Sequence, residues 1–121
     1  MTANQPVLLI CNDDVLRRSL LHRLGVERCH VVRTWSAARR ASQVPTPRIV
    51  VVEIPRERTM EDIMLLAARW AQIGMPWFAL VHCDATGRDM VTLGATAFFN
   101  RYRVSMYDIG EVLVAAIEHN S

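Results

Sequence analysis

The stretch Arg48-Ile49-Val50-Val51-Val52-Glu53-Ile54 decides the fold. Its centre is β-branched and continuously apolar, which is typical of a central strand buried on both faces of a parallel sheet. Four further apolar runs lie on either side of this stretch in the sequence. They predict strands over residues 6–11, 29–33, 76–82 and 96–100. The run over residues 29–33 is the most polar of them and fits a strand nearer the edge of the sheet.

Five helical patterns lie between and after these runs. The first covers residues 14–24, repeats Leu16, Leu20 and Leu24 on one face, and ends at Gly25. A short Ala-rich helix toward residue 43 is predicted to start at a Thr34 or Ser36 cap. The third helix starts at the capping box Thr59-Met60-Glu61-Asp62 and ends at Gly74. The fourth covers about residues 86–93 and ends at Gly94. The final helix starts at the capping box formed by Ser105 and Asp108.

The spacing of apolar residues predicts which helix faces are buried. The helix before Gly74 is expected to bury Ile63, Leu66, Trp70 and Ile73, and the last helix to bury Ile109, Val112, Leu113, Ala116 and Ile117. Strict alternation of strand and helix with short loops predicts right-handed crossovers and a doubly wound α/β domain. All of residues 1–121 are assigned to this one domain.

Composition excludes several classes of protein. The chain is 51% hydrophobic and 21% charged, which is unlike a disordered protein. No apolar run approaches the roughly 18 residues of a membrane span, and the first residues do not fit a signal peptide, so a cytoplasmic protein is expected. All fourteen basic residues are Arg, but they are scattered and the net charge is only +2, which argues against nucleic-acid binding.

The three cysteines, Cys11, Cys29 and Cys83, are odd in number and have no Cys-x-x-Cys spacing. A disulfide framework is therefore not expected, and all three are interpreted as small buried hydrophobic residues. Trp70 and Trp77 are interpreted as core residues and Trp35 as partly exposed.

Chemistry in a doubly wound sheet gathers at the carboxyl ends of the strands. The polar residues that follow the strands are Asn12, Asp13 and Asp14, then Glu53, then His82, Cys83 and Asp84, and finally Arg101. A zinc or Cys-His site from Cys11, His82, Cys83 and Asp84 is disfavoured, because the strands before these residues would not be neighbours in the fold considered next.

Three stretches, residues 8–14, 47–54 and 94–101, resemble the receiver domain of bacterial response regulators, and the resemblance covers essentially the whole chain. It implies a flavodoxin-like sheet of five parallel strands in the order 2-1-3-4-5, flanked by five helices. In that family an Asp after the third strand accepts a phosphoryl group. Two acids after the first strand hold Mg²⁺, a Ser or Thr follows the fourth strand, and a Lys follows the fifth.

The sequence departs from this pattern at most of these positions. Glu53 matches the phosphoacceptor, although its longer side chain is expected to collide with a site sized for Asp. Asn12 replaces the first acid, while Asp13 keeps the second, and Asp14 is the other candidate because the segment is one residue short. The hydroxyl position falls on Val81 or His82, the lysine position on Arg101, and the switch aromatic on Phe98.

The resemblance therefore implies a pseudo-receiver, a non-enzymatic signalling domain with no catalytic residue and no cofactor beyond weak Mg²⁺ at Asp13 and Glu53. The alternative is a receiver that still accepts phosphate from a histidine kinase, through Asp13, Asp14 or an adapted Glu53. Glu53 and Arg101 are expected to face each other, either locking the domain in one state or forming a solvated pair at a disused site.

Partner binding is the expected activity. The resemblance implies a protein partner, an output domain or a second copy of the chain at the face formed by the fourth helix, fifth strand and fifth helix. The candidate contact residues there are Phe99, Tyr102, Arg103, Met106 and Tyr107.

Overall fold

The fold is a single parallel sheet between two layers of helices. A computed structural model describes residues 5–41, 47–56 and 60–119. Its strands lie in the order β2-β1-β3-β4-β5, which confirms the predicted topology. Their bounds are β1 (Val7–Ile10), β2 (Cys29–Val32), β3 (Ile49–Glu53), β4 (Trp77–Val81) and β5 (Ala97–Asn100).

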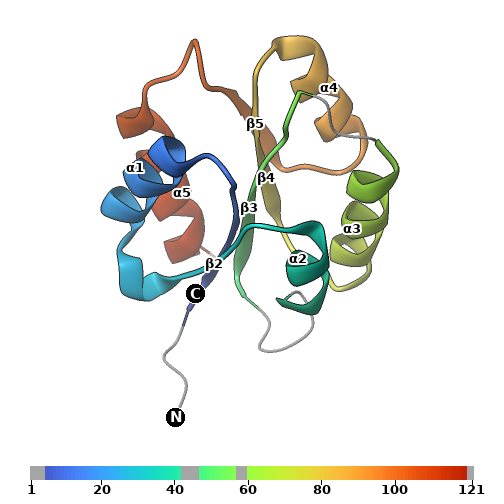
Figure 1. Cartoon of the computed structure of the whole chain (residues 1–121), viewed down its shortest axis with the longest axis horizontal. Coiled ribbons are helices and arrows are strands. Elements are labelled where there is room, and N and C mark those ends of the chain that lie inside the picture. The colour runs from blue at the N-terminus through green and yellow to red at the C-terminus, as the bar shows by residue number, and fades with distance from the viewer. Residues whose placement is uncertain (1–4, 42–46, 57–59, 120–121) are drawn as a thin grey trace.

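Five α-helices connect and cover the strands. They are α1 (Asp14–Leu24), α2 (Trp35–Ala41), α3 (Met60–Gln72), α4 (Asp84–Thr92) and α5 (Met106–His119), with one short 3₁₀ turn over Val26–Arg28. Figure 1 shows α1 and α5 on one face of the sheet and α2, α3 and α4 on the other. No helix in the described ranges is both long and apolar enough to cross a membrane.

The predicted helix ends agree with the structure in most places. Gly25 and Gly94 follow α1 and α4 with φ of 96° and 114°, values that favour glycine. The Thr34 hydroxyl accepts a hydrogen bond from the Ala37 N–H at 3.0 Å, as a cap for α2 should. The predicted cap at Thr59 and the end of the second helix toward residue 43 lie outside the described residues.

One predicted boundary was wrong. Helix α4 begins at Asp84, two residues before the predicted start, because Cys83 takes the cap position and its carbonyl accepts the Gly87 N–H at 3.2 Å. A turn of α4 therefore follows β4 almost directly, which places Cys83 and Asp84 at the carboxyl edge of the sheet.

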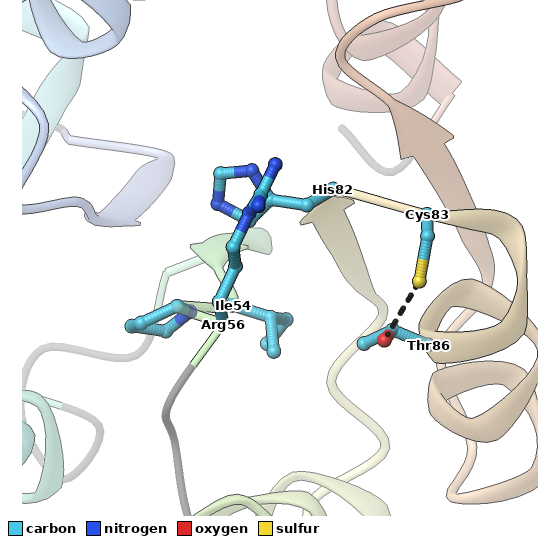
Figure 2. Close-up of a pocket in the computed structure, with 6 residues that line it drawn as sticks. Ile54, Arg56, His82, Cys83 and Thr86 are labelled. Atoms are coloured by element: carbon cyan, nitrogen blue, oxygen red, sulfur yellow. Dashed lines mark hydrogen bonds between the residues drawn. The ribbon is translucent and has the colours of Figure 1, made fainter.

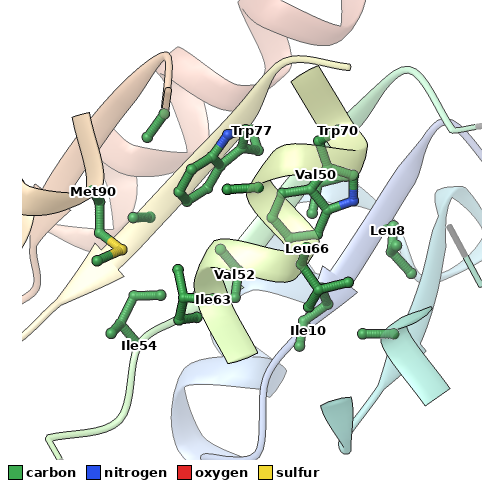
Figure 3. Close-up of a cluster of buried hydrophobic side chains, with 14 of the residues drawn as sticks. Leu8, Ile10, Val50, Val52, Ile54, Ile63, Leu66, Trp70, Trp77 and Met90 are labelled. Atoms are coloured by element: carbon green, nitrogen blue, oxygen red, sulfur yellow. The ribbon is translucent and has the colours of Figure 1, made fainter. Parts of the chain in front are cut away.

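Alternation along the strands divides the core into two layers. Leu8, Ile10, Val50 and Val52 pack under α2, α3 and α4, whereas Val7, Leu9, Ile49 and Val51 pack under α1 and α5. Figure 3 shows the first layer, in which Trp70 and Trp77 lie with ring centroids 5.3 Å apart. Every residue of β3 is buried, as its apolar run predicts.

Two predicted core residues are exposed. Ile73 follows the last residue of α3, where the chain turns at Gly74, so its side chain leaves the buried face. Val112 lies outside a stripe of α5 that is narrower than predicted and contains Ile109, Leu113 and Ile117. Phe98 and Phe99 pack into opposite layers, as strand alternation predicts.

Candidate functional site

Glu53 is the centre of the polar cluster at the carboxyl edge of the sheet. It is the last residue of β3, and only 9% of it is exposed. Its Oε1 accepts hydrogen bonds from the backbone N–H groups of Asn12 (3.0 Å) and Asp13 (3.2 Å). The predicted collision was wrong, because the loop after β1 receives the longer side chain and hydrogen-bonds to it.

Arg101 joins two acids through the two ends of its guanidinium group. It follows β5, and its backbone N–H bonds to the Val81 carbonyl at 3.0 Å, which places it beside β4. Its Nη1 donates to Glu53 Oε2 at 3.2 Å, and its Nη2 donates to Asp13 Oδ2 at 2.9 Å. Only 16% of the Arg101 side chain and 9% of the Glu53 side chain are exposed, so this pair is largely buried, whereas 34% of the Asp13 side chain is exposed.

Asp13 has a second role at the start of α1. Its Oδ1 accepts the Leu16 N–H at 3.0 Å and thereby caps the helix. The hydrogen bond from Leu16 and then the Arg101 guanidinium lower the pKa of the Asp13 carboxyl. Asp13, and not Asp14, is therefore the acid that lies beside Glu53 in the cluster.

The other two predicted residues of the acidic pocket lie apart from the cluster. Asn12 contributes its backbone N–H, while the residue itself is exposed. Asp14 pairs with Arg17 at 2.7 Å on the first turns of α1, and its side chain is largely exposed. The side chains that meet at the site are therefore those of Glu53, Asp13 and Arg101.

The residues present do not fit Mg²⁺, the ion that the resemblance implies. A magnesium site needs carboxylate oxygens that point at a shared cation. Here the Arg101 guanidinium already lies against Glu53 Oε2 and Asp13 Oδ2, and two backbone N–H groups take Glu53 Oε1. No group of three or more His, Cys, Asp or Glu residues in the described parts of the chain could hold a metal ion.

The end of β4 offers no small hydroxyl group to the cluster. Val81 is fully buried in the layer under α4. His82 lies nearer the surface, where its Nδ1 is 3.2 Å from the Tyr102 hydroxyl. Partial burial and then the positive charge of Arg101 lower the pKa of His82. The lowered pKa favours the neutral form of the His82 imidazole, which does not add a second positive charge near Arg101.

Sequence reasoning missed a second polar network beside the first. Asn100, the buried last residue of β5, donates from Nδ2 to Asp84 Oδ1 at 3.0 Å and accepts the Tyr102 N–H at 3.0 Å. Asp84 also pairs with Arg103 at 3.1 Å. The signal available in the sequence was an amide at the end of an apolar strand, where a buried polar group needs partners.

A pocket of about 310 Å³ opens beside the cluster, between the loops after β3 and β4. Figure 2 shows Arg56 and His82 on one side of it and the Cys83–Thr86 hydrogen bond on the other. Ile54 and Pro55 complete its wall. Arg56 was not among the predicted site residues.

The prediction that all three cysteines are buried was wrong for Cys83. Cys11 and Cys29 are buried, but Cys83 is exposed because it caps α4 at the surface. Burial, and then the charge of Glu53, raises the pKa of Cys11 to about 12, and burial raises that of Cys29 to about 11. A hydrogen bond from the Thr86 hydroxyl lowers the pKa of Cys83.

These environments predict a large difference in thiol reactivity. The thiolate is the reactive form, so Cys83 should react with an aromatic disulfide reagent in the folded protein while Cys11 and Cys29 should not. We expect one thiol to react under native conditions and three in denaturant, as counted by absorbance. Cys83→Ser is the control and should leave no rapid reaction. Fast release of two or more equivalents from the folded chain would contradict the burial of Cys11 and Cys29.

The predicted contact face has a different composition from that expected. Tyr102, Arg103 and Tyr107 are exposed, and the Tyr107 ring lies under the Arg23 guanidinium at 4.2 Å. Phe99 is buried and stacks on Phe78 at 6.2 Å, so its assignment to the contact face was wrong. Met106 is half-buried against the core layer of α1 and α5.

Solved structures of similar fold include receiver domains of response regulators. The Francisella response regulator 1452 receiver domain matches with a TM-score of 0.77 and 13% identity, over 98% of this chain and all of that one. The receiver domain of NtrX from Brucella abortus matches at 0.75 and 19% identity, over 93% of this chain and 98% of that one. The non-phosphorylated HemR receiver domain from Leptospira biflexa matches at 0.72 and 20% identity, over 92% of both chains.

The sequence itself matches no protein-family model and no curated protein. At identities of 20% or less, the structural likeness establishes the receiver fold, and function has to be argued from the site.

Proposed function

We propose that this chain is a receiver-like signalling domain that acts by binding another protein, without accepting a phosphoryl group and without catalysing a reaction. The observation that carries the proposal is the guanidinium bridge from Arg101 to Glu53 and Asp13. In the receiver pattern, the acceptor carboxylate must be free to attack phosphorus while a metal ion offsets the charge of the phosphoryl oxygens. Here both oxygens of Glu53 already have hydrogen-bond donors.

The bridge also suggests a fixed conformational state. In the receiver pattern, the residue at the position of Arg101 pairs with the phosphoryl group once it arrives. Glu53 is longer than Asp by one methylene group and places its own carboxylate against Arg101 at 3.2 Å. The pair is made within the chain, so its formation does not depend on a kinase. On this proposal the domain binds its partner constitutively.

Phosphorylation is the direct test. We expect incubation with acetyl phosphate and Mg²⁺ to leave the mass of the chain unchanged, with no gain of a phosphate. Both carboxylate oxygens of Glu53 already accept hydrogen bonds, and the Arg101 guanidinium takes the place of the cation. Intact-mass spectrometry checks this, with an ordinary phosphoaccepting receiver treated in the same vessel as the positive control. A stable adduct on Glu53, Asp13 or Asp14 would favour the alternative, a phosphoaccepting receiver with an adapted acidic pocket.

The proposed binding face consists of α4, β5 and α5, with Tyr102, Arg103 and Tyr107 as its exposed anchors. Tyr and Arg are enriched among the residues that dominate interface energies, since each combines apolar area with hydrogen-bonding groups. Arg103 pairs with Asp84, which Asn100 holds, in the polar network beside the site.

Replacing both Tyr102 and Tyr107 by Ala is expected to abolish capture of the partner while leaving the fold intact. Exposed side chains contribute little to stability, so the unfolding midpoint should move only slightly. The measurement is affinity capture from lysate of the source cells, comparing wild type, the double variant and Val26→Ala, which changes an exposed residue outside α4, β5 and α5. Identical sets of captured proteins for all three would show that this face is not the binding surface.

A further inference from the structure

Helix α3 carries an apolar stripe on its outer surface. Its inner face is buried by Ile63, Leu66, Ala67 and Trp70. On the outer face, Met64 is 51% exposed and Leu65 is 61% exposed, Met60 is also exposed, and Ala68 lies one turn beyond Met64. Contiguous exposed apolar side chains are a feature of protein interaction surfaces.

Leu65 stands between two hollows of opposite charge. The first, of about 360 Å³, lies between α2 and α3 and is lined by Arg39, Leu65, Leu66, Ala68, Arg69 and Gln72. The second, of about 470 Å³, is lined by Glu61, Met64 and Leu65. Figure 1 shows α2 and α3 on the same face of the sheet. The surface therefore has a projecting apolar centre, a basic side and an acidic side.

The charges on the stripe have no partners within the described part of the chain. Glu61 lies four residues before Leu65 and Arg69 lies four residues after it, so each is about 6 Å from Leu65 along the helix axis. Neither Glu61 nor Arg69 makes an ion pair with any residue that the structure describes. A stripe with an acid at one end and a base at the other is complementary to an antiparallel copy of itself.

We propose that two copies of the chain pair through α3, antiparallel, about a two-fold axis that passes near Leu65. A two-fold contact uses the same patch on both copies. In this arrangement Glu61 of each copy meets Arg69 and Arg39 of the other, at the basic hollow. The Leu65 side chains of the two copies meet at the axis, and the small Ala68 beside them leaves room for this contact.

The geometry also sets the strength of the association. One helix pair buries less than the roughly 1,200 Å² of a standard stable interface, so the dimer should be weak and concentration-dependent. It uses a surface separate from Tyr102 and Tyr107, so it goes beyond the proposed function. A dimer formed through α3 leaves α4, β5 and α5 open to another protein.

Sedimentation equilibrium on the full chain tests the dimer. Wild type should show a monomer–dimer equilibrium at micromolar to millimolar concentrations. Leu65→Asp should weaken the association by at least about a hundredfold, because an apolar side chain is lost from both sides of the axis and a charge is introduced. Leu65 is exposed, so this variant should fold, which circular dichroism checks. The Tyr102→Ala, Tyr107→Ala variant is the control and should dimerise like wild type.

Exchanging the charges distinguishes the proposed two-fold pairing from nonspecific hydrophobic association. Glu61→Arg alone and Arg69→Glu alone should each weaken the dimer, because like charges then meet across the axis. The variant with both changes should recover it, because the stripe is again complementary to itself. Arg39→Glu, at an exposed position, serves as a second basic-side change if Arg69→Glu disturbs folding.

Three results would overturn the proposal: a wild-type chain that stays monomeric at the highest concentration, a dimer that Leu65→Asp leaves intact, or a double charge exchange that fails to restore association. Loss of the dimer in the tyrosine variant would move the interface to α4, β5 and α5. None of these outcomes bears on whether Glu53 accepts phosphate, so the two proposals can fail separately.

Discussion

Arg101→Ala is expected to lower the free energy of unfolding by about 2–4 kcal/mol, since removing one member of a largely buried ion cluster leaves the other charges uncompensated. Glu53 and Asp13 would then face each other without a cation. Urea denaturation followed by tryptophan fluorescence measures the loss, because Trp70 and Trp77 are buried in the folded state.

Arg103→Ala is the matched control for this change. Arg103 lies two residues farther along the same loop and also pairs with an acid, Asp84, but 73% of its side chain is exposed. Such exposed pairs contribute at most about 1 kcal/mol. If both variants lost the same free energy of unfolding, the Arg101 cluster would contribute no more to stability than an exposed ion pair.

Magnesium should distinguish Arg101→Ala from wild type. In wild type the Arg101 guanidinium pairs with both carboxylates, so millimolar Mg²⁺ should leave the unfolding curve and the tryptophan fluorescence unchanged. In Arg101→Ala, two carboxylates are freed, and an ion bound only by the folded state adds about 1.4 kcal/mol at ten times its dissociation constant. Strong stabilisation of wild type by Mg²⁺ would contradict the idea that Arg101 replaces the metal ion.

Acidification gives a second readout of the same cluster. Folding lowers the pKa of Asp13, so its stabilising contribution is present above the ordinary aspartate pKa of about 4 and is lost as the pH falls through the lower folded-state value. Arg101→Ala should show a smaller loss of stability over that range. Some loss should remain, because the Leu16 N–H still bonds to the carboxylate.

The fold could be predicted because it depends on local patterns. The apolar run around Val51 identified a strand buried on both faces, and the spacing of Leu16, Leu20 and Leu24 identified α1 with its observed bounds. These signals lie within a few residues of one another. The start of α4 was missed because no preferred capping residue precedes it; Cys83 takes that position without a side-chain cap bond.

The site could be predicted only in part, because its contacts join distant residues. Strand ends identified Glu53, Asp13 and Arg101 as neighbours, and the contact between Glu53 and Arg101 is confirmed. The sequence did not reveal that Arg101 would also reach Asp13, 88 residues away. That second contact depends on the direction in which the Arg101 side chain extends across the edge of the sheet. The spacing of apolar residues in the sequence carries no information about that direction. It is also the contact that places a guanidinium group between the two carboxylates.

Gly87→Ala should have the next largest effect, with a loss of about 1–3 kcal/mol, the usual cost of overpacking a core. Helix propensity alone would give the opposite sign, because Ala is favoured over Gly inside a helix by about 1 kcal/mol. Gly87 is buried in α4, and a Cβ atom there would overlap the ring of Phe98. Thermal unfolding measures the difference.

Gly110→Ala is the matched control, since Gly110 is also buried within a helix, α5. A Cβ atom at Gly110 would lie 3.1 Å from Arg23 Cβ, a tight contact but a much milder one than the overlap at Gly87. The change in stability should therefore be smaller than at Gly87. A Gly87→Ala variant at least as stable as wild type would mean that the Phe98 ring moves away without cost.

A double-mutant cycle with Phe98→Ala tests the contact itself. Phe98 stands at the switch position implied by the receiver resemblance, and it packs with the layer under α4. Phe98→Ala removes the ring that meets the new methyl group, so Gly87→Ala in that background should cost little or stabilise by up to about 1 kcal/mol. The coupling between the two changes should then exceed 1 kcal/mol. Additive effects would mean that the Phe98 ring does not limit the size of the side chain at position 87.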